Sequence, residues 1–338
     1  MDYIFDIFYE EIFETMERNG LQTRQCRRDV IDRLNSVISG CIRGQNLSAD
    51  ECSRQAVLSA IEYHQRHKEE NGNVCLMGKY HNILYVTIRV AWDWGVTDSE
   101  VVTSLLKEIY SCELTFERLF LGVIFGTNAP YFISGWRSDF KDQDENTRAM
   151  VYFLHHAANT QLEFPVFVEK CNCVKMIKFI DIPIESCGRA SPLRVTLQAS
   201  APDILLILLR HGASPNPFDD GIPPVIALFD KLIEYQDRRY PYQLDSCLRL
   251  LLRTLSFIEL PFKPLIYEAR KEMFIEKYEV LLEDKLIQPN RVFGVPELKH
   301  LSRCKIREEL NKNCQLPRGI KQLKIPGKLR RYIDLMEE

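Results

Sequence analysis

The sequence predicts an all-α protein, and three observations support this fold class. Apolar residues recur at helical spacing through the first 145 or so residues. A weak repeat with a period of about 33 residues follows, which is typical of stacked helix pairs. From residue 296 onward, short apolar stripes alternate with breaks at Asn, Pro and Gly. We therefore expect an N-terminal helical region at 1–145, helical repeats at 146–290 and a C-terminal unit of three short helices at 296–338.

The N-terminal region begins with an amphipathic segment. Residues 3–17 place apolar side chains mostly three or four positions apart, on one helical face: Ile4, Phe5, Phe8, Ile12 and Met16. Residues 82–94 are rich in β-branched and aromatic residues and are compatible with either a strand or a buried helix. Because helical segments flank them on both sides, a buried helix is favoured.

Two further helix starts carry a capping-box pattern, in which a Ser or Thr is followed three residues later by Glu. Ser48 and Glu51 precede an apolar run that begins at Ala56. Thr97 and Glu100 precede a second run. Since the hydroxyl of such a residue accepts a hydrogen bond from the first turn, the pattern predicts helix N-termini at Ser48 and Thr97.

The weak repeat has three starts. The first, Leu154-His155-His156-Ala157-Ala158, is followed by an apolar, helix-like stretch through Phe167 and Val168. The second is Ser191-Pro192-Leu193 and the third is Gly221-Ile222-Pro223-Pro224. A proline in the first turn of a helix has no unsatisfied amide to lose, so Pro192 and Pro224 are suited to helix starts. They lie 32 residues apart.

The second repeat resembles the ankyrin family. Ser191-Pro192-Leu193-Arg194 stands where Thr-Pro-Leu-His is usual, and Leu209 to Ala213 matches the end of that repeat. Gly212 falls where a helix ends in the left-handed conformation. The resemblance implies stacked helix pairs whose groove binds a protein, so it favours an interaction module over an enzyme.

Residues 296–338 contain three apolar stripes at helical spacing. Asn313 and Pro317 separate the first from the second, and Pro326-Gly327 separates the second from the third. A unit this small does not cover its own apolar surface and needs the rest of the chain or a partner. The stripes are Leu298, Leu301, Ser302, Ile306 and Leu310, then Ile320 and Leu323, then Leu329, Tyr332, Ile333 and Met336.

The order of these residues resembles a SOCS box. In that family the first helix carries the BC box, Leu-x-x-x-Cys-x-x-x-aliphatic, which binds elongin C. The motif maps onto Leu298, Ser302 and Ile306, with Leu301 beside them. The resemblance implies that Leu298 inserts into an apolar pocket of elongin C. Ser302 replaces the usual Cys and places a hydroxyl in a contact that is normally apolar.

The family's later cullin box, Leu-Pro-Leu-Pro followed by Leu and Tyr, selects cullin-5. It maps onto Leu323-Lys324-Ile325-Pro326 and the residues after it, with Lys324 in place of the first Pro. The resemblance implies a cullin-facing side formed by Leu323, Ile325, Pro326, Leu329, Tyr332 and Ile333.

Together, the ankyrin-like repeats and the SOCS box resemble a degenerate branch of the ankyrin repeat and SOCS box family. The resemblance implies a non-catalytic substrate-recognition adaptor of a RING-type ubiquitin ligase. Its implied partners are elongin C and elongin B, cullin-5 with its RING protein, and a protein substrate. The alternative is an ankyrin-type scaffold whose C-terminal helices are structural.

The composition excludes several other classes of protein. A formal net charge of −3 gives no reason to expect nucleic acid as a partner. The densest apolar run, Ile204 to Leu209, is far too short to cross a membrane, and the N-terminus does not resemble a secretory signal. We therefore expect a cytosolic or nuclear protein with no membrane partner. Since no catalytic or nucleotide-binding motif is present, we expect neither enzyme activity nor a cofactor.

The 11 cysteines are an odd number and fit reduced thiols in that compartment. Cys171, Cys173 and Cys187 could form a zinc site on paper with the His155-His156 pair. However, zinc-binding cysteines are usually separated by two to four residues, and Cys-x-Cys is unusual. Free, buried thiols are therefore the favoured interpretation, and we expect no metal site.

Overall fold

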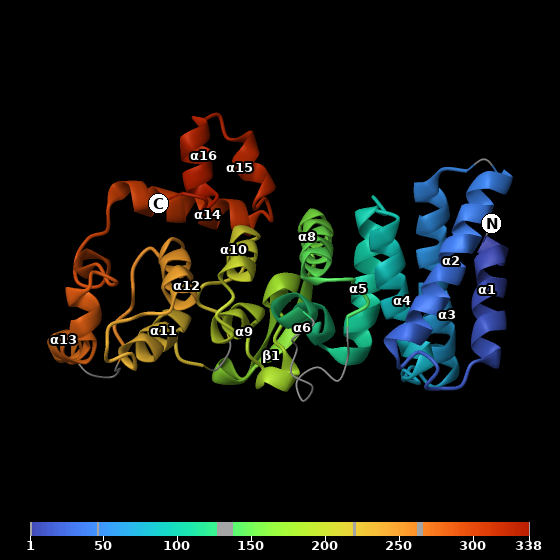
Figure 1. Ribbon diagram of the computed structural model, residues 1–338, viewed down its shortest axis with the longest axis horizontal. Helices are drawn as coiled ribbons and strands as arrows, with labels where there is room; N and C mark the ends of the chain where they lie inside the picture. The colour runs from blue at the N-terminus through green and yellow to red at the C-terminus, as the bar shows by residue number, and fades with distance from the viewer. Residues whose placement is uncertain (1, 46, 127–137, 219–220, 262–265, 338) are drawn as a thin grey trace. The chain divides into compact units, whose positions relative to one another are not determined.

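The computed structural model describes residues 2–45, 47–126, 138–218, 221–261 and 266–337, which divide into two compact units at Leu162. Both units are mainly helical, which confirms the predicted all-α fold class (Figure 1). None of the described helices has both the length and the apolar character needed to cross a membrane. The predicted division into 1–145, 146–290 and 296–338 stays a prediction.

The first unit is helical throughout its described secondary structure, and α4 lies among α2, α3 and α5. This central place explains the composition of residues 82–94, which form a buried helix as predicted. Ile83, Leu84, Val86 and Val90 are fully buried there, and their packing outweighs the weak helix propensity of β-branched residues. The helices are α1 (Asp2–Thr15), α2 (Arg24–Gln45), α3 (Ala49–Glu70), α4 (Lys79–Asp93), α5 (Ser99–Glu113), α6 (Glu117–Phe125) and α8 (Gln143–Asn159).

One of the two predicted helix caps is confirmed and the other is wrong by one residue. Ser48 caps α3 and accepts a hydrogen bond of 3.1 Å from the amide of Glu51. The cap of α5 is Asp98, not Thr97, and its carboxylate accepts from the amides of Glu100 and Val101. A carboxylate is favoured at this position because it also interacts with the positive end of the helix dipole.

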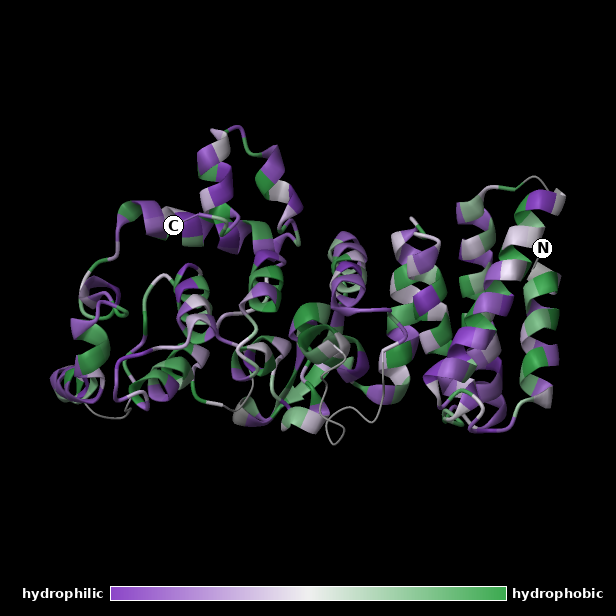
Figure 2. Ribbon diagram, in the orientation of Figure 1, coloured by the Kyte–Doolittle hydropathy of each residue, from purple (hydrophilic) through white to green (hydrophobic). Residues whose placement is uncertain are grey.

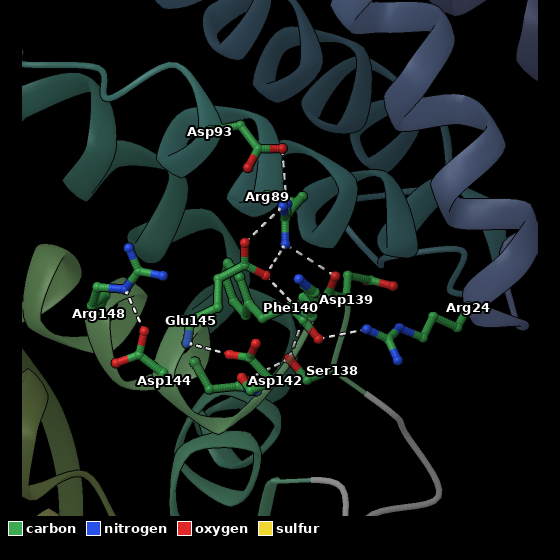
Figure 3. A network of polar contacts seen from close by, with 12 residues as sticks. Arg24, Arg89, Asp93, Ser138, Asp139, Phe140, Asp142, Asp144, Glu145 and Arg148 are labelled. Carbon is green, nitrogen blue, oxygen red and sulfur yellow. Dashed lines mark hydrogen bonds and ion pairs between the residues drawn. The ribbon is translucent and has the colours of Figure 1, made fainter.

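A network of polar contacts links α2, α4, α8 and the segment before α8 within the first unit (Figure 3). Arg89 of α4 donates to Asp93, one turn further along, at 2.8 Å and to Glu145 of α8 at 2.7 Å. Arg24 of α2 donates to the carbonyl oxygen of Phe140 at 2.5 Å. The segment before α8 is therefore fixed to α2 and α4 by charge-assisted hydrogen bonds.

The second unit begins with an antiparallel hairpin of β1 (Glu163–Val168) and β2 (Cys173–Lys178). The prediction of a helix-like stretch through Phe167 and Val168 is therefore wrong. Burial alternates strictly along β1, with every second side chain buried, which is the period of a strand. Pro165 also disfavours a helix interior because it lacks an amide hydrogen.

The short turn of this hairpin changes the prediction for two cysteines. Cys171 and Cys173 are joined by a disulfide, with their Cα atoms 5.3 Å apart. The prediction of free, buried thiols is therefore wrong for this pair, and Cys171 is exposed. The turn folds the chain back on itself and brings the two Cα atoms within the range that a disulfide spans.

The helix pairs of the repeats follow the hairpin, and α9 packs against both α10 and α11. Ser191 caps α9 and accepts from the amide of Arg194, while Pro192 and Pro224 occupy the first turns of α9 and α11. Gly212 has φ +93°, so the predicted left-handed helix end is confirmed. The helices are α9 (Pro192–Gln198), α10 (Pro202–Arg210), α11 (Pro224–Ile233), α12 (Tyr242–Leu252) and α13 (Tyr267–Glu283).

Candidate functional site

Three short helices follow at the C-terminus, as predicted: α14 (Leu298–Lys312), α15 (Arg318–Gln322) and α16 (Gly327–Ile333). They enclose a small hydrophobic core of their own. Four of its side chains are buried, namely Leu316, Ile320, Tyr332 and Ile333, and four others pack against them, namely Ile306, Leu310, Leu323 and Ile325. Most of the apolar stripes predicted from the sequence therefore hold these three helices together.

A second face of α14 is buried but polar. His300, Arg303 and Arg307 are the buried residues of this helix, and Figure 2 shows α14 as mostly hydrophilic. Their spacing of three and four residues places them on one side of the helix. Buried charges and imidazoles require partners. His300 and Arg307 find theirs outside α14, while Arg303 donates to His300 of the same helix and lies over the ring of Tyr332.

His300 is held in one tautomer by a backbone carbonyl on one side of its ring and an arginine on the other. Its Nε2 atom lies 2.7 Å from the carbonyl oxygen of Leu255, and its Nδ1 atom lies 2.9 Å from Nη2 of Arg303. Since a guanidinium only donates, Nδ1 accepts and Nε2 carries the proton. Burial, reinforced by the charges of Arg291 and Arg303, lowers the pKa of His300 to about 4.

Arg307 connects the ends of two helices. Its guanidinium donates to the carbonyl oxygen of Ile333 at 3.0 Å and to that of Leu209. These carbonyls lie in the last turns of α16 and α10, where carbonyl groups lack partners within the helix. Burial lowers the pKa of Arg307 to about 10, so the side chain stays charged at neutral pH and suits the negative ends of both helices.

The glycine that ends α10 lets α14 approach closely. The Nδ2 atom of Asn311 donates to the carbonyl oxygen of Gly212 at 3.0 Å. A Cβ atom at Gly212 would lie 2.3 Å from the Asn311 side chain. Lys178 of β2 also donates to the backbone carbonyl of Asn311. The C-terminal helices are thus fixed to the repeats by polar contacts as well as by packing.

The predicted elongin-binding residues differ in exposure. Leu298 is 80% exposed and Ser302 is also exposed, and their spacing of four residues puts them on the same outward face of α14. Leu301 is partly buried and lines a cavity of about 560 Å³ next to the loops that follow α10 and α12. Ile306 turns towards the small core. An exposed leucine at the start of this helix is therefore the main apolar contact available to a partner.

The predicted cullin-facing residues fall into two groups. Pro326 and Leu329 are exposed and could contact a partner directly. The other four, Leu323, Ile325, Tyr332 and Ile333, belong to the small core or pack on it. Tyr332 is only 7% exposed, and Nζ of Lys299 lies 4.1 Å from the centre of its ring.

Among the described residues, one group of side chains has atoms close enough to hold a metal ion: His64, Cys75, His81 and Cys112. It belongs to the first unit and contains none of the residues of the zinc site considered from the sequence. Intervals of 10, 5 and 30 residues separate its members. Because those intervals match no zinc-finger spacing, the sequence pattern gave no reason to select them.

Comparison with known proteins agrees with this geometry. The SOCS box family model matches residues 294–334. Ankyrin repeat and SOCS box protein 17 of the dog, Canis lupus familiaris, is 29% identical over 156 residues, which cover 43% of this chain. The match spans about half of that relative, 49% of its length. No solved structure matches the chain. The three C-terminal helices therefore correspond to a SOCS box, and the chain is similar to a protein of the ankyrin repeat and SOCS box family.

Proposed function

We propose that this protein is a substrate-recognition adaptor of an elongin B/C–cullin-5 RING ubiquitin ligase and acts in the cytosol or nucleus. In this role it catalyses no chemistry itself. It holds a protein substrate close to a charged ubiquitin-conjugating enzyme, so that a substrate lysine meets the thioester at high effective concentration. The repeats supply the substrate-binding part and the SOCS box supplies the connection to elongin C and cullin-5.

The exposure of Leu298 is the observation that carries the proposal. The residue is 80% exposed at the first position of α14, although eight other apolar side chains of the SOCS box form or pack against its small core. A leucine on a helix face is a typical anchor for a groove on a partner. Leu298 is also the residue that aligns with the first position of the BC box.

The alternative is a scaffold in which the SOCS box only stabilises the repeats. The buried partners of His300 and Arg307 favour this alternative, because they fix α14 to the repeats without any other protein. They do not account for Leu298, which makes no such internal packing. The two roles use opposite faces of α14 and are compatible.

Co-expression with elongins B and C, followed by gel filtration, tests the adaptor function. We expect a stoichiometric complex with the unaltered chain. Leu298→Asp should weaken it at least about 30-fold, because an unpaired carboxylate would enter an apolar pocket at a cost of about 2 kcal/mol or more. The exposure of Leu298 predicts that this variant still folds.

Tyr242→Asp is a matched control, because Tyr242 is 77% exposed in the same unit but outside the SOCS box. It should bind elongins as the unaltered chain does. If the unaltered chain forms no complex, or if Leu298→Asp binds normally, the adaptor function is refuted and the scaffold replaces it. Addition of cullin-5 and, separately, cullin-2 to the purified complex tests the cullin-5 assignment.

A further inference from the structure

Two imidazoles and two thiols converge in the first unit from four separate segments. His64 lies on α3, His81 on α4 and Cys112 on α5, while Cys75 lies in the loop between α3 and α4. One ligand-type atom of each residue lies within 4.8 Å of the other three. His64 and His81 are buried, and the two cysteines are half-buried. Segments as far apart as 64 and 112 in the sequence therefore meet at one point.

The distances fit a tetrahedral metal site. The Nε2 atom of His64 lies 3.3 Å from Sγ of Cys75 and 3.6 Å from Sγ of Cys112. The Nδ1 atom of His81 lies 3.8 Å from Sγ of Cys75. With zinc–sulfur and zinc–nitrogen bonds of about 2.3 and 2.0–2.1 Å, tetrahedral ligands are roughly 3.3–3.8 Å apart. A zinc ion could therefore bind with little rearrangement of these atoms.

Each histidine uses its other nitrogen to bind a carboxylate. Nδ1 of His64 lies 2.9 Å from Oε1 of Glu108, and Nε2 of His81 lies 2.7 Å from Oε1 of Glu113. An ionised carboxylate only accepts, so it fixes the proton on the nitrogen that faces it. The lone pairs of His64 Nε2 and His81 Nδ1 are then directed at the cysteines. Carboxylate–histidine pairs of this kind orient the ligands of zinc sites.

Further partners hold both carboxylates in place. Gln65 donates to Glu108 at 2.8 Å, and Tyr85 donates to Glu113 at 2.6 Å.

We propose that His64, Cys75, His81 and Cys112 form a structural zinc site that joins α3, α4, α5 and the loop at residues 71–78. Two thiolates and two imidazoles suit zinc, whereas magnesium and calcium prefer oxygen ligands. Four protein ligands leave no open position for a substrate, so the site is structural rather than catalytic. The proposal departs from the sequence-based expectation of no metal, and it is independent of the adaptor function.

The full-length chain, purified under reducing conditions and without a metal-affinity step, provides the test. Elemental analysis should find one zinc per chain. Replacement by Co²⁺ should give the visible absorption of tetrahedral cobalt together with sulfur-to-cobalt charge transfer. Alkylation followed by peptide mass spectrometry should show Cys75 and Cys112 protected by zinc and exposed after chelation. Cys26, in the same unit but outside the cluster, should react equally in both states.

Glu113→Gln tests the orienting carboxylate. The variant keeps all four ligands and should bind zinc about 10–100-fold more weakly, with the same cobalt spectrum at saturation. Cys112→Ser should lose the site, whereas the control Cys26→Ser should retain one zinc. The zinc content and cysteine protection of the unaltered chain test the proposal by themselves, even if a ligand variant does not fold. Absence of bound zinc after incubation with excess metal, or recovery of Cys75 and Cys112 as a disulfide under these conditions, would overturn it.

Discussion

Arg210 and Asp334 join the last turn of α10 to the end of α16. The guanidinium donates two hydrogen bonds to the two carboxylate oxygens, at 3.0 and 2.6 Å. This bidentate geometry is the strong form of an ion pair. Arg307 bonds the backbone carbonyls of the same two helix ends. Two arginines therefore fix the SOCS box to the ankyrin-like repeats at these helix ends. Arg210 binds a carboxylate, whereas Arg307 binds backbone carbonyls.

Removal of this pair should loosen the SOCS box from the repeats. We expect Arg210→Ala to lower the local free energy of unfolding by about 1–3 kcal/mol, because Asp334 would be left largely buried without its partner. Hydrogen exchange of the peptides that cover α14 and α16 measures this. Tryptophan fluorescence is unsuitable, since the sequence has no tryptophan from Glu163 onward, where the second unit begins.

Lys305→Ala is the control for the ion pair. Lys305 is exposed and pairs on the surface with Glu308 and Glu309, so its loss should leave stability almost unchanged. A double-mutant cycle with Asp334→Asn isolates the coupling energy of the Arg210 pair. Equal effects of Arg210→Ala and Lys305→Ala would contradict the prediction.

Acid should destabilise the second unit through His300. Its pKa is about 4 in the folded protein, below its ordinary value of 6.5, so the unfolded chain binds the proton more readily. Stability is therefore lost as pH falls from about 6.5 towards 4. At pH 5 the loss amounts to about 2 kcal/mol relative to pH 7 for a shift of this size.

His300→Gln separates this effect from other titrations. Glutamine keeps a donor for the carbonyl oxygen of Leu255 but has no pKa in this range. The difference in hydrogen exchange of α14 between pH 7 and pH 5 should therefore be smaller in the variant than in the unaltered chain. The same pH dependence in both proteins would show that His300 is not the group responsible.

Local sequence patterns were sufficient to predict many elements of this fold. The cap at Ser48, the glycine at the end of α10 and the three helices of the SOCS box depend on residues within a few positions of one another. The same reasoning failed at β1, where Phe167 and Val168 continue an apolar run. The strict alternation of burial, together with Pro165, distinguishes a strand there from a helix.

The buried polar face of α14 could not be predicted locally. His300, Arg303 and Arg307 have the composition of an exposed helix face. His300 and Arg307 are buried because the carbonyl groups of Leu255 and Leu209, distant in the sequence, accept their hydrogen bonds. Arg303 donates to His300 and lies over the ring of Tyr332. The four residues of the candidate metal site were missed for the same reason, since they become neighbours only when α3, α4 and α5 pack together.

Restoration of the family's cysteine at Ser302 should tighten elongin C binding. Ser302 is exposed on the outward face of α14, so Ser302→Cys should leave the stability of the free chain unchanged. In the complex, the serine hydroxyl would enter an apolar contact at a cost of roughly 1 kcal/mol or more. We expect about fivefold tighter binding or better by calorimetry with elongin B/C. Weaker binding would show that the hydroxyl has a hydrogen-bond partner in the complex.

Two residues of the predicted cullin-facing side should respond differently to truncation. Ile333 is 4% exposed within the small core, so Ile333→Ala should destabilise the SOCS box by about 2–4 kcal/mol and weaken binding to elongin and cullin together. Leu329 is 41% exposed, so Leu329→Ala should leave stability within about 0.5 kcal/mol and weaken only the cullin contact.

Two measurements on each immobilised variant distinguish these outcomes. The first is binding of elongin B/C and then of cullin-5, and the second is hydrogen exchange, which reports on folding. Normal cullin-5 binding by Leu329→Ala would remove this residue from the proposed contact, and the contribution of Ile333 would then be structural alone.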